Sequence, residues 1–349
     1  MEEQWTWTTA SEDITLDSLF QSQDKLCFLV GSGISLDSPS CLPTGYQFTK
    51  ALLEQLIPTD VRSKILELMD PNRENMHSSG DFLRFEQLME YLQTYDPDLH
   101  VLDLYSNCKT PNFNHLFLAK MLKQGHKVTT TNFDNLIEYA LMKMDLSEDQ
   151  IFPLISRQDW EQRSNESHCI YKLHGSLVDF QTGQDCRESL QATMVKIGQD
   201  KSEVFHLELW KRQALHDLFQ SYDLLFLGYS GLDDFDVLPT LRTIHSPKRL
   251  LWISHDAECS LDDAKIEVLK VNPANTLSTN RTRDNIIQFN RYRSRQPENL
   301  IHISVNTTEL LEWMWKKYIQ DPISLPTDAS SPCPEKEFSL PISMNLSEG

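Results

Sequence analysis

The feature that most constrains the fold is a series of short apolar segments that each end abruptly in glycine or polar residues. The first, residues 25–30, runs directly into Gly31-Ser32-Gly33. Apolar runs of about four to eight residues that stop in this way are typical of strands buried in a parallel sheet. Five further segments have the same character: residues 127–131, 169–173, 223–227, 249–254 and 300–304.

Helical patterns separate these strand segments. Apolar residues at spacings of three and four predict helices over residues 46–56, 135–144, 204–222 and 308–319, the last capped by Asn306 and Thr307. Residues 59–123 are mostly helical in pattern and are interpreted as an insertion. Strands that alternate with helices predict an α/β fold, a doubly wound, Rossmann-like parallel sheet with a helical insertion at about 59–123.

The chain divides into three parts by pattern. Residues 25–319 carry the α/β alternation and are expected to form one domain, preceded by an N-terminal segment at 1–24. Residues 320–349 contain five prolines and six serines with only scattered apolar positions. That composition predicts a disordered tail or linker.

Composition excludes several classes of protein. Hydrophobic residues make up 40% of the 349 positions, enough for a core, so a fully disordered chain is excluded. The net charge of −19 makes nucleic-acid binding a poor hypothesis. No apolar stretch approaches the roughly 20 residues of a membrane span, and the acidic start does not resemble a secretory signal. The seven cysteines include no Cys-x-x-Cys pair, which favours free thiols in the cytoplasm.

Chemistry-bearing residues follow four of the predicted strands. Ligands of parallel α/β sheets bind at the carboxyl ends of strands, so these four groups are expected on one rim. Around Gly31 the glycines would let backbone N–H groups approach a diphosphate, although Leu36 stands where a dinucleotide fingerprint has its third glycine. A turn that merely joins strand to helix explains those glycines equally well. The groups are residues 31–35, 130–135, 173–176 and 228–234.

Taken in chain order, the four groups resemble the motifs of the SIR2 family, which includes the NAD-dependent sirtuin deacylases and SIR2-like NAD-hydrolysing proteins. Gly-Ser-Gly-Ile-Ser at 31–35 is similar to the first motif, and Thr-Thr-Asn-Phe-Asp-Asn at 130–135 to Thr-Gln-Asn-x-Asp. Leu-His-Gly at 173–175 resembles the motif of the essential histidine, and Gly-Tyr-Ser at 228–230 a later Gly-x-Ser motif. The resemblance spans roughly residues 25–319 and implies a sirtuin-type fold.

Two departures bear on the branch of the family. Sirtuin deacylases carry a zinc ribbon of two Cys-x-x-Cys pairs between the last two motifs, where this chain has only Cys186. The Pro-x-Phe-Arg element is also absent after residues 31–35. Both differences favour the zinc-free, NAD-hydrolysing branch over protein deacylation, and no bound metal is expected. The carboxylates Asp233, Asp234 and Asp236 are interpreted as charge bias at a helix start.

The resemblance implies roles for individual residues. Asn132 and His174 are the expected catalytic residues: an amide donates and accepts without charging the site, and a histidine serves as a base near neutral pH. Each has a plainer alternative, because Asn132 could cap the helix near Asn135, and most histidines only form hydrogen bonds. Ser254 and His255 could equally form a surface turn. The residues expected to hold NAD⁺ are Gly31, Ser32, Gly33, Ser35, Thr131, Asp134, Gly228, Ser230, Ser254 and His255.

The expected activity is an NAD⁺ glycohydrolase, which yields nicotinamide and ADP-ribose or a cyclic form. The alternative from another class is a catalytically silent module that binds NAD or ADP-ribose, and a deacylase is less favoured. Many relatives implied by the resemblance act in antiviral or immune defence, so assembly as a homo-oligomer and a separate sensor or activator protein are expected. The insertion and the helix at 204–222 are the predicted contact surfaces. No membrane or nucleic-acid partner is expected.

Overall fold

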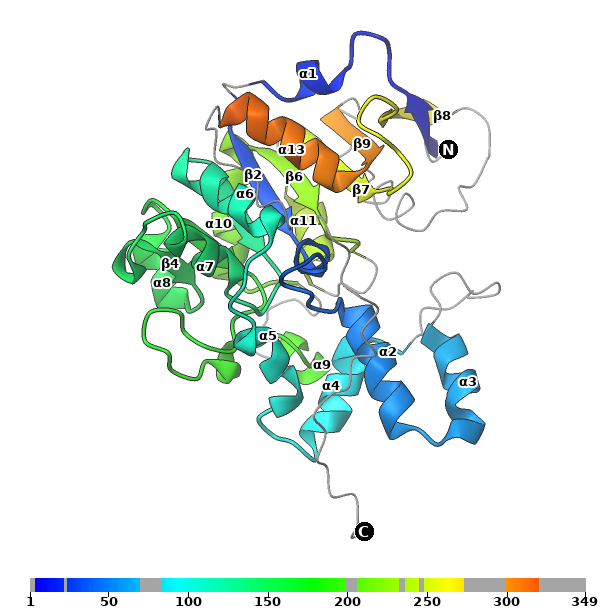
Figure 1. Ribbon diagram of the computed structural model, residues 1–349, viewed down its shortest axis with the longest axis vertical. Helices are drawn as coiled ribbons and strands as arrows, with labels where there is room; N and C mark the ends of the chain where they lie inside the picture. Colours follow the sequence, from blue (N-terminus) through cyan, green and yellow to red (C-terminus); the bar gives the residue numbers. More distant parts are fainter. Residues whose placement is uncertain are drawn as a thin grey trace.

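The computed structural model describes residues 4–21, 24–69, 83–198, 206–231, 236–244, 248–272 and 299–319. Its centre is a nine-stranded sheet in the order β1-β8-β9-β7-β6-β2-β3-β5-β4 (Figure 1). The strands are β1 (Gln4–Thr9), β2 (Leu26–Val30), β3 (Lys127–Thr130), β4 (Phe152–Leu154), β5 (Cys169–Lys172), β6 (Asp223–Leu227), β7 (Leu250–His255), β8 (Lys265–Asn272) and β9 (Leu300–Val305).

Most of this sheet is parallel. The seven strands from β9 to β4 pair in parallel, β8 pairs antiparallel with β9, and β1 pairs antiparallel with β8. The prediction of a doubly wound α/β fold is confirmed, and each of the six predicted strands is present within a residue or so of its expected ends. The short strand β4 and the antiparallel pair β1 and β8 were not predicted.

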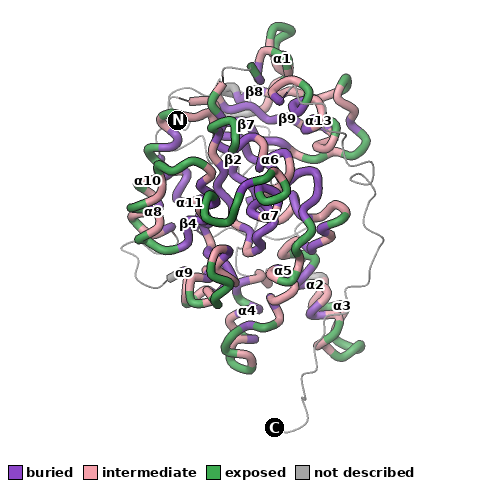
Figure 2. The backbone as a smooth tube through the Cα atoms, turned by 60° about the vertical axis from the view of Figure 1, so that its left-hand side comes forward, coloured by how far each residue is buried: buried purple, intermediate pink, exposed green. Residues whose placement is uncertain are grey.

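Side-chain alternation along β2 shows how the sheet separates two cores. Leu26, Phe28 and Val30 enter the core on one face, and Cys27 and Leu29 enter the core on the other. All five residues are fully buried, as expected for a central parallel strand covered on both faces (Figure 2). The first face is covered by α6 (Phe113–Lys123), α7 (Leu136–Met142) and α13 (Thr307–Tyr318), and the second by α8 (Arg157–Arg163), α10 (Leu209–Ser221) and α11 (Val237–Thr243).

A third apolar core lies in a helical group beside the sheet (Figure 1). Phe48, Leu52, Met89 and Leu102 are among its buried members. The helices are α2 (Gly45–Leu56), α3 (Thr59–Met69), α4 (Phe85–Gln93), α5 (Asp103–Asn107) and α9 (Met194–Gly198). Within the range expected for the insertion, α6 instead packs on the sheet through Phe117. The tail expected at 320–349 lies outside the described residues.

The remaining elements are short. They are α1 (Leu16–Leu19) and the 3₁₀ turns η1 (Ser32–Ser35), η2 (His100–Leu102), η3 (Glu148–Gln150) and η4 (Arg187–Ser189). The expected cap Asn306 is confirmed, since its Oδ1 accepts from the N–H groups of Thr308 and Glu309. In the described ranges, no helix combines the length and apolar character needed to cross a bilayer.

Free thiols are found at Cys27, Cys108, Cys169, Cys186 and Cys259. Cys41 is disulfide-bonded, so the expectation of free thiols is wrong at that position.

Candidate functional site at the carboxyl ends of the strands

A cavity of about 650 Å³ opens at the carboxyl ends of the central strands. Its walls come from the segments that follow β2, β3, β5, β6 and β7, with further residues from the helical group. The volume falls within the range of about 300–1,000 Å³ that is usual for small-molecule sites. All twelve residues expected at the site line it: Gly31, Ser32, Gly33, Ser35, Thr131, Asn132, Asp134, His174, Gly228, Ser230, Ser254 and His255.

The cavity forms where the chain changes direction across the sheet. From β2 the chain continues to β3 on one side and later to β6 on the other, so the loops after β2 and β6 lie side by side. Gly31 N–H donates to the Leu227 carbonyl at 3.2 Å, and Gly33 N–H donates to the Gly228 carbonyl at 2.9 Å. A crevice at such a switch point is the usual ligand site of doubly wound sheets.

Glycine is required here for close packing between the two loops. A Cβ added at Gly33 would lie 2.8 Å from the Gly228 Cα, and one added at Gly228 would lie 2.6 Å from the Ile34 nitrogen. Gly228 also has a φ of +60°, which disfavours residues with a side chain. Because the N–H groups of Gly31 and Gly33 donate to the neighbouring loop, the structural role of these glycines is loop contact. Binding of a diphosphate by this turn stays a prediction.

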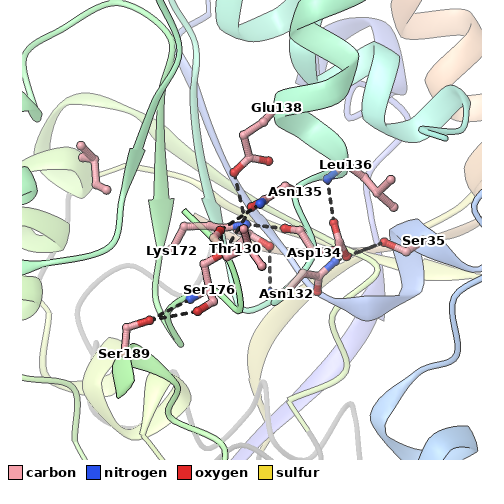
Figure 3. A network of polar contacts seen from close by, with 12 residues as sticks. Ser35, Thr130, Asn132, Asp134, Asn135, Leu136, Glu138, Lys172, Ser176 and Ser189 are labelled. Atoms are coloured by element: carbon pink, nitrogen blue, oxygen red, sulfur yellow. Dashed lines mark hydrogen bonds and ion pairs between the residues drawn. The ribbon is translucent and has the colours of Figure 1, made fainter. Parts of the chain in front are cut away.

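A directional hydrogen-bond network holds Asn132. Its Nδ2 lies 3.3 Å from Ser35 Oγ, which also lies 3.1 Å from His115 Nε2 and 3.2 Å from Asp134 Oδ2. Asn112 N–H donates to His115 Nδ1, so the ring proton of a neutral His115 is on Nε2. Ser35 Oγ therefore accepts from His115 and Asn132. It donates to the Asp134 carboxylate (Figure 3).

Burial fixes the protonation state of this network. His115 is fully buried, and desolvation lowers its pKa to about 4, so the ring is neutral at physiological pH. Because Nδ2 of Asn132 points to Ser35, Oδ1 is the atom through which this side chain can accept from a ligand.

Asn132 does not cap α7: Asn135 is the cap residue, and Leu136 N–H donates to Asp134 Oδ1. His115 was not predicted at the site. It lies in the first turn of α6, four residues after Pro111.

Beneath this network lies a buried ion pair. Lys172 Nζ is 3.2 Å from Glu138 Oε1, and the same ammonium donates to the Asp134 carbonyl (Figure 3). Both side chains are 1% exposed, and burial raises the pKa of Glu138 while Lys172 opposes that rise. The Lys172 ammonium thereby ties the loop after β3 to β5 and α7.

His174 follows β5 and contacts a carboxylate from a distant part of the chain. Its Nε2 lies 2.9 Å from Asp236 Oδ1, and the His174 and Asp236 side chains are 14% and 1% exposed. Lys211 Nζ donates to the Leu173 carbonyl at 2.7 Å, and Gln191 N–H donates to the His174 carbonyl at 3.0 Å. The sequence shows Asp236 only as one of three acidic residues, and no local pattern distinguishes it as the partner of His174.

At the end of β7, two cavity residues contact β9 and α13. Ser254 Oγ is 2.8 Å from His302 Nε2, and Thr307 N–H donates to His255 Nδ1 at 3.3 Å. Ser254 is half-buried and His255 is exposed at the end of β7, and a role of either residue in ligand binding stays a prediction. Neither His302 nor Thr307 was predicted at the site.

The charge of the cavity wall is acidic. Asp37, Glu86 and Asp134 line it, and no described lining residue is a lysine or an arginine. Within the described lining, the donors open to an anionic ligand are therefore backbone N–H groups, hydroxyls, amides and the imidazoles of His174 and His255. Among the described residues, no group of three or more His, Cys, Asp or Glu side chains is arranged to hold a metal ion.

The fold and the cavity define a Rossmann-like α/β protein with its candidate site at a topological switch point. Residues 126–267 match the SIR2-like domain family. The match includes Asn132, His174 and Gly228, while residues 31–35 precede it. This match covers less than half of the chain, so residues 126–267 are similar to SIR2-like domains, a family that uses NAD⁺. A search of curated proteins found no match to the chain.

Proposed function

We propose that the protein is an NAD⁺ glycohydrolase that cleaves the bond between the nicotinamide nitrogen and C1′ of the ribose. The observation that carries the proposal is that Asn132 and His174 line one cavity together with the loops after β2 and β6. The products are nicotinamide and ADP-ribose, or a cyclic form if a ligand group replaces water as the acceptor. The SIR2-like match supports the link to NAD⁺.

Bond cleavage needs positioning more than acid catalysis, because nicotinamide leaves as a neutral molecule. The ribose develops oxocarbenium character, as in other glycoside cleavages, and an amide can hold its hydroxyl without adding charge. Asn132 suits this role because its Nδ2 is held by Ser35, which directs how Oδ1 is presented. Because hydrogen bonds already hold the Asn132 side chain in place, its Oδ1 can stabilise the transition state without a rearrangement of the site during the reaction.

His174 would take the proton. In hydrolysis, the water oxygen bonds to C1′ as the C1′–N bond breaks, and one water proton is released for each nicotinamide. With Nε2–H donating to the Asp236 carboxylate, Nδ1 is the basic nitrogen of His174. The carboxylate stabilises the imidazolium that forms, the arrangement found where an acid orients a catalytic histidine.

The test is nicotinamide release from NAD⁺ by the purified full chain, measured by chromatography over a range of protein concentrations. Asn132→Ala and His174→Ala should each lower the rate at least about 100-fold, the lower end of what a positioned base contributes. His168→Ala is the matched control, since His168 lies just before β5, outside α10 and the helical group, where its Nδ1 contacts the Gln150 carbonyl. No release in any assembly state, with ADP-ribose still bound, would favour the silent binding module. Release that requires an acylated peptide would favour a deacylase.

Activity is further proposed to depend on assembly in the cytoplasm, as expected of a defence effector with a separate activator. The helical group and α10 offer exposed apolar side chains: Tyr91 and Tyr95 are 60% and 63% exposed, and Leu209 is 59% exposed. Mass measurement by size-exclusion chromatography, with and without NAD⁺, tests the homo-oligomer. A monomer with full activity contradicts assembly control.

A further inference from the structure

The backbone of His174 is held by one hydrogen-bond donor on each side. Lys211 Nζ donates to the Leu173 carbonyl, which belongs to the peptide group before His174, at 2.7 Å. Gln191 N–H donates to the carbonyl of His174 itself at 3.0 Å. Because peptide groups are planar, these two contacts fix the planes before and after His174. They thereby set the direction in which its side chain leaves the backbone.

The two donors are connected to each other by Glu208, the N-cap residue of α10. Its carboxylate lies 3.1 Å from Lys211 Nζ, and its Oε1 accepts from Gln191 Nε2 at 3.5 Å. The side chains of Lys211 and Glu208 are 3% and 20% exposed. Gln191, Glu208 and Lys211 therefore form one connected group, the His174 support.

Stability is a weak reason for a buried ammonium at this position. Burial of a charge costs free energy, and a buried ion pair is often no more stable than apolar side chains of similar volume. A charged donor, however, forms a shorter and stronger hydrogen bond than a neutral one. The 2.7 Å contact between Lys211 Nζ and the Leu173 carbonyl is the part of this arrangement that an apolar residue cannot replace.

The ring of His174 is anchored from the same region of the fold. Its Nε2 lies 2.9 Å from Oδ1 of Asp236, the cap residue of α11. Leu207 N–H donates to Thr240 Oγ1 at 2.7 Å, which ties the segment before α10 to α11. The backbone and the ring of His174 are thus both held from the starts of α10 and α11. A shift at Lys211 would move the histidine relative to its carboxylate.

We propose that Lys211 is a positioning residue, which with the rest of the His174 support holds the His174 ring where it can take the proton of the attacking water. His174 is the base only under the proposed function, on which this inference rests. Neither Lys211 nor Glu208 is part of the described cavity lining, so both act through the histidine. A displacement of a reacting group by about 1 Å can lower a rate about 100-fold.

Steady-state release of nicotinamide from NAD⁺ by the full chain tests this role. Lys211→Met should lower kcat per folded molecule about 10- to 100-fold and leave KM within about twofold, because no ligand contact is removed. Lys211→Arg keeps a cationic donor and should recover part of kcat.

Arg249→Met is the matched control for the kinetic test. Arg249 Nη1 donates to the Leu19 carbonyl, and Nη2 pairs with Asp223 at 2.6 Å, so this cation also holds a backbone carbonyl and a carboxylate. It lies at the amino ends of β6 and β7, away from the cavity. Its replacement removes the same kinds of contact and should leave kcat per folded molecule unchanged.

Nuclear magnetic resonance of ¹⁵N-labelled histidines gives a readout that needs no turnover. The His174 signals are those absent from His174→Ala. Above neutral pH they should show one tautomer protonated on Nε2, the nitrogen that contacts Asp236. Lys211→Met should shift or broaden these signals, whereas Arg249→Met should not. Glu208→Gln keeps the shape of the support and should give a smaller change in kcat and in the signals, which serves if Lys211→Met does not fold.

The outcomes separate this inference from the proposed function. Unchanged kcat in Lys211→Met, or a rise in KM with kcat unchanged, overturns the positioning role and leaves NAD⁺ hydrolysis standing. Equal losses of kcat in Lys211→Met and Arg249→Met, with unchanged His174 signals, also overturn it, because a general structural effect then explains both. If the wild-type protein releases no nicotinamide, the hydrolase is contradicted, and the histidine signals decide whether Lys211 positions the ring.

Discussion

His174 Nε2 and Asp236 Oδ1 lie 2.9 Å apart, although 62 positions separate the two residues in the chain. His174 follows β5, and Asp236 is the cap residue of α11, in the segment that follows β6. The contact therefore joins the segments that follow β5 and β6. This contact orients the His174 ring, as the proposed proton transfer requires.

Asp236→Asn should lower kcat for nicotinamide release roughly 10- to 100-fold, with little change in KM. The amide can still accept from Nε2–H, but it no longer stabilises the imidazolium by charge. Steady-state kinetics on NAD⁺ give both constants. Asp236→Glu keeps the carboxylate and should recover part of kcat. Asp262→Asn, at an exposed residue between β7 and β8, is the control. A rise in KM with kcat unchanged would show that Asp236 supports substrate binding instead.

Stability should fall on acidification because His115 is buried as a neutral ring. Its folded-state pKa is lowered to about 4 by desolvation, while the unfolded-state pKa is near about 6.5. At pH values between these two pKa values, a proton binds the unfolded state but not the folded state. The free energy of unfolding therefore rises with pH in this range, and the contribution of His115 to stability is lost as pH falls from about 6.5 to 4. The loss from this residue is on the order of 3 kcal/mol.

Urea unfolding at pH 5 and pH 7 measures this difference. His126 contributes in the same direction, since burial lowers its pKa to about 4 as well. His115→Asn retains a donor and an acceptor but does not titrate, so it should reduce the pH dependence. A pH dependence identical to that of the wild-type protein would show that His115 is not the group responsible.

Gly228→Ala should destabilise the protein by more than about 2 kcal/mol. The substitution adds the left-handed backbone penalty of about 1–2 kcal/mol to a backbone clash at 2.6 Å with the Ile34 nitrogen. Gly125→Ala isolates the first contribution, because Gly125 has a φ of +88° but no atom within 4 Å of an added Cβ. Denaturant unfolding of both variants gives the comparison. Equal losses would mean that the loops after β2 and β6 adjust without cost.

Lys172→Met should cost about 3–5 kcal/mol, because it leaves the buried Glu138 carboxylate without its cation. The double variant Lys172→Met with Glu138→Leu should be more stable than the single one, since it removes the unpaired charge. Urea unfolding measures both. A double variant no more stable than the single would indicate that the Lys172 contact with the Asp134 carbonyl dominates.

Local pattern was sufficient for six of the seven parallel strands that the structure describes, all but the three-residue β4. The six predicted strands are runs of consecutive apolar residues because central strands bury both faces, as Leu26 to Val30 do. The strands β1 and β8 escaped prediction because they lie at an antiparallel edge, where alternating polar residues weaken the apolar signal. The helix expected over 204–222 begins at Leu209 in the structure, since no local signal marked its first turn.

The sequence by itself determined the α/β class, the order of the strand-end groups and twelve of the residues that line the cavity. Parallel strands present their carboxyl ends at one edge, so position after a strand predicts location. Only the tertiary structure decided the partners: Asp236 for His174, His115 for Ser35, and His302 with Glu267 for Ser254. These contacts join residues 35 or more positions apart, and they arise because buried polar groups must be paired by whatever the fold brings near them.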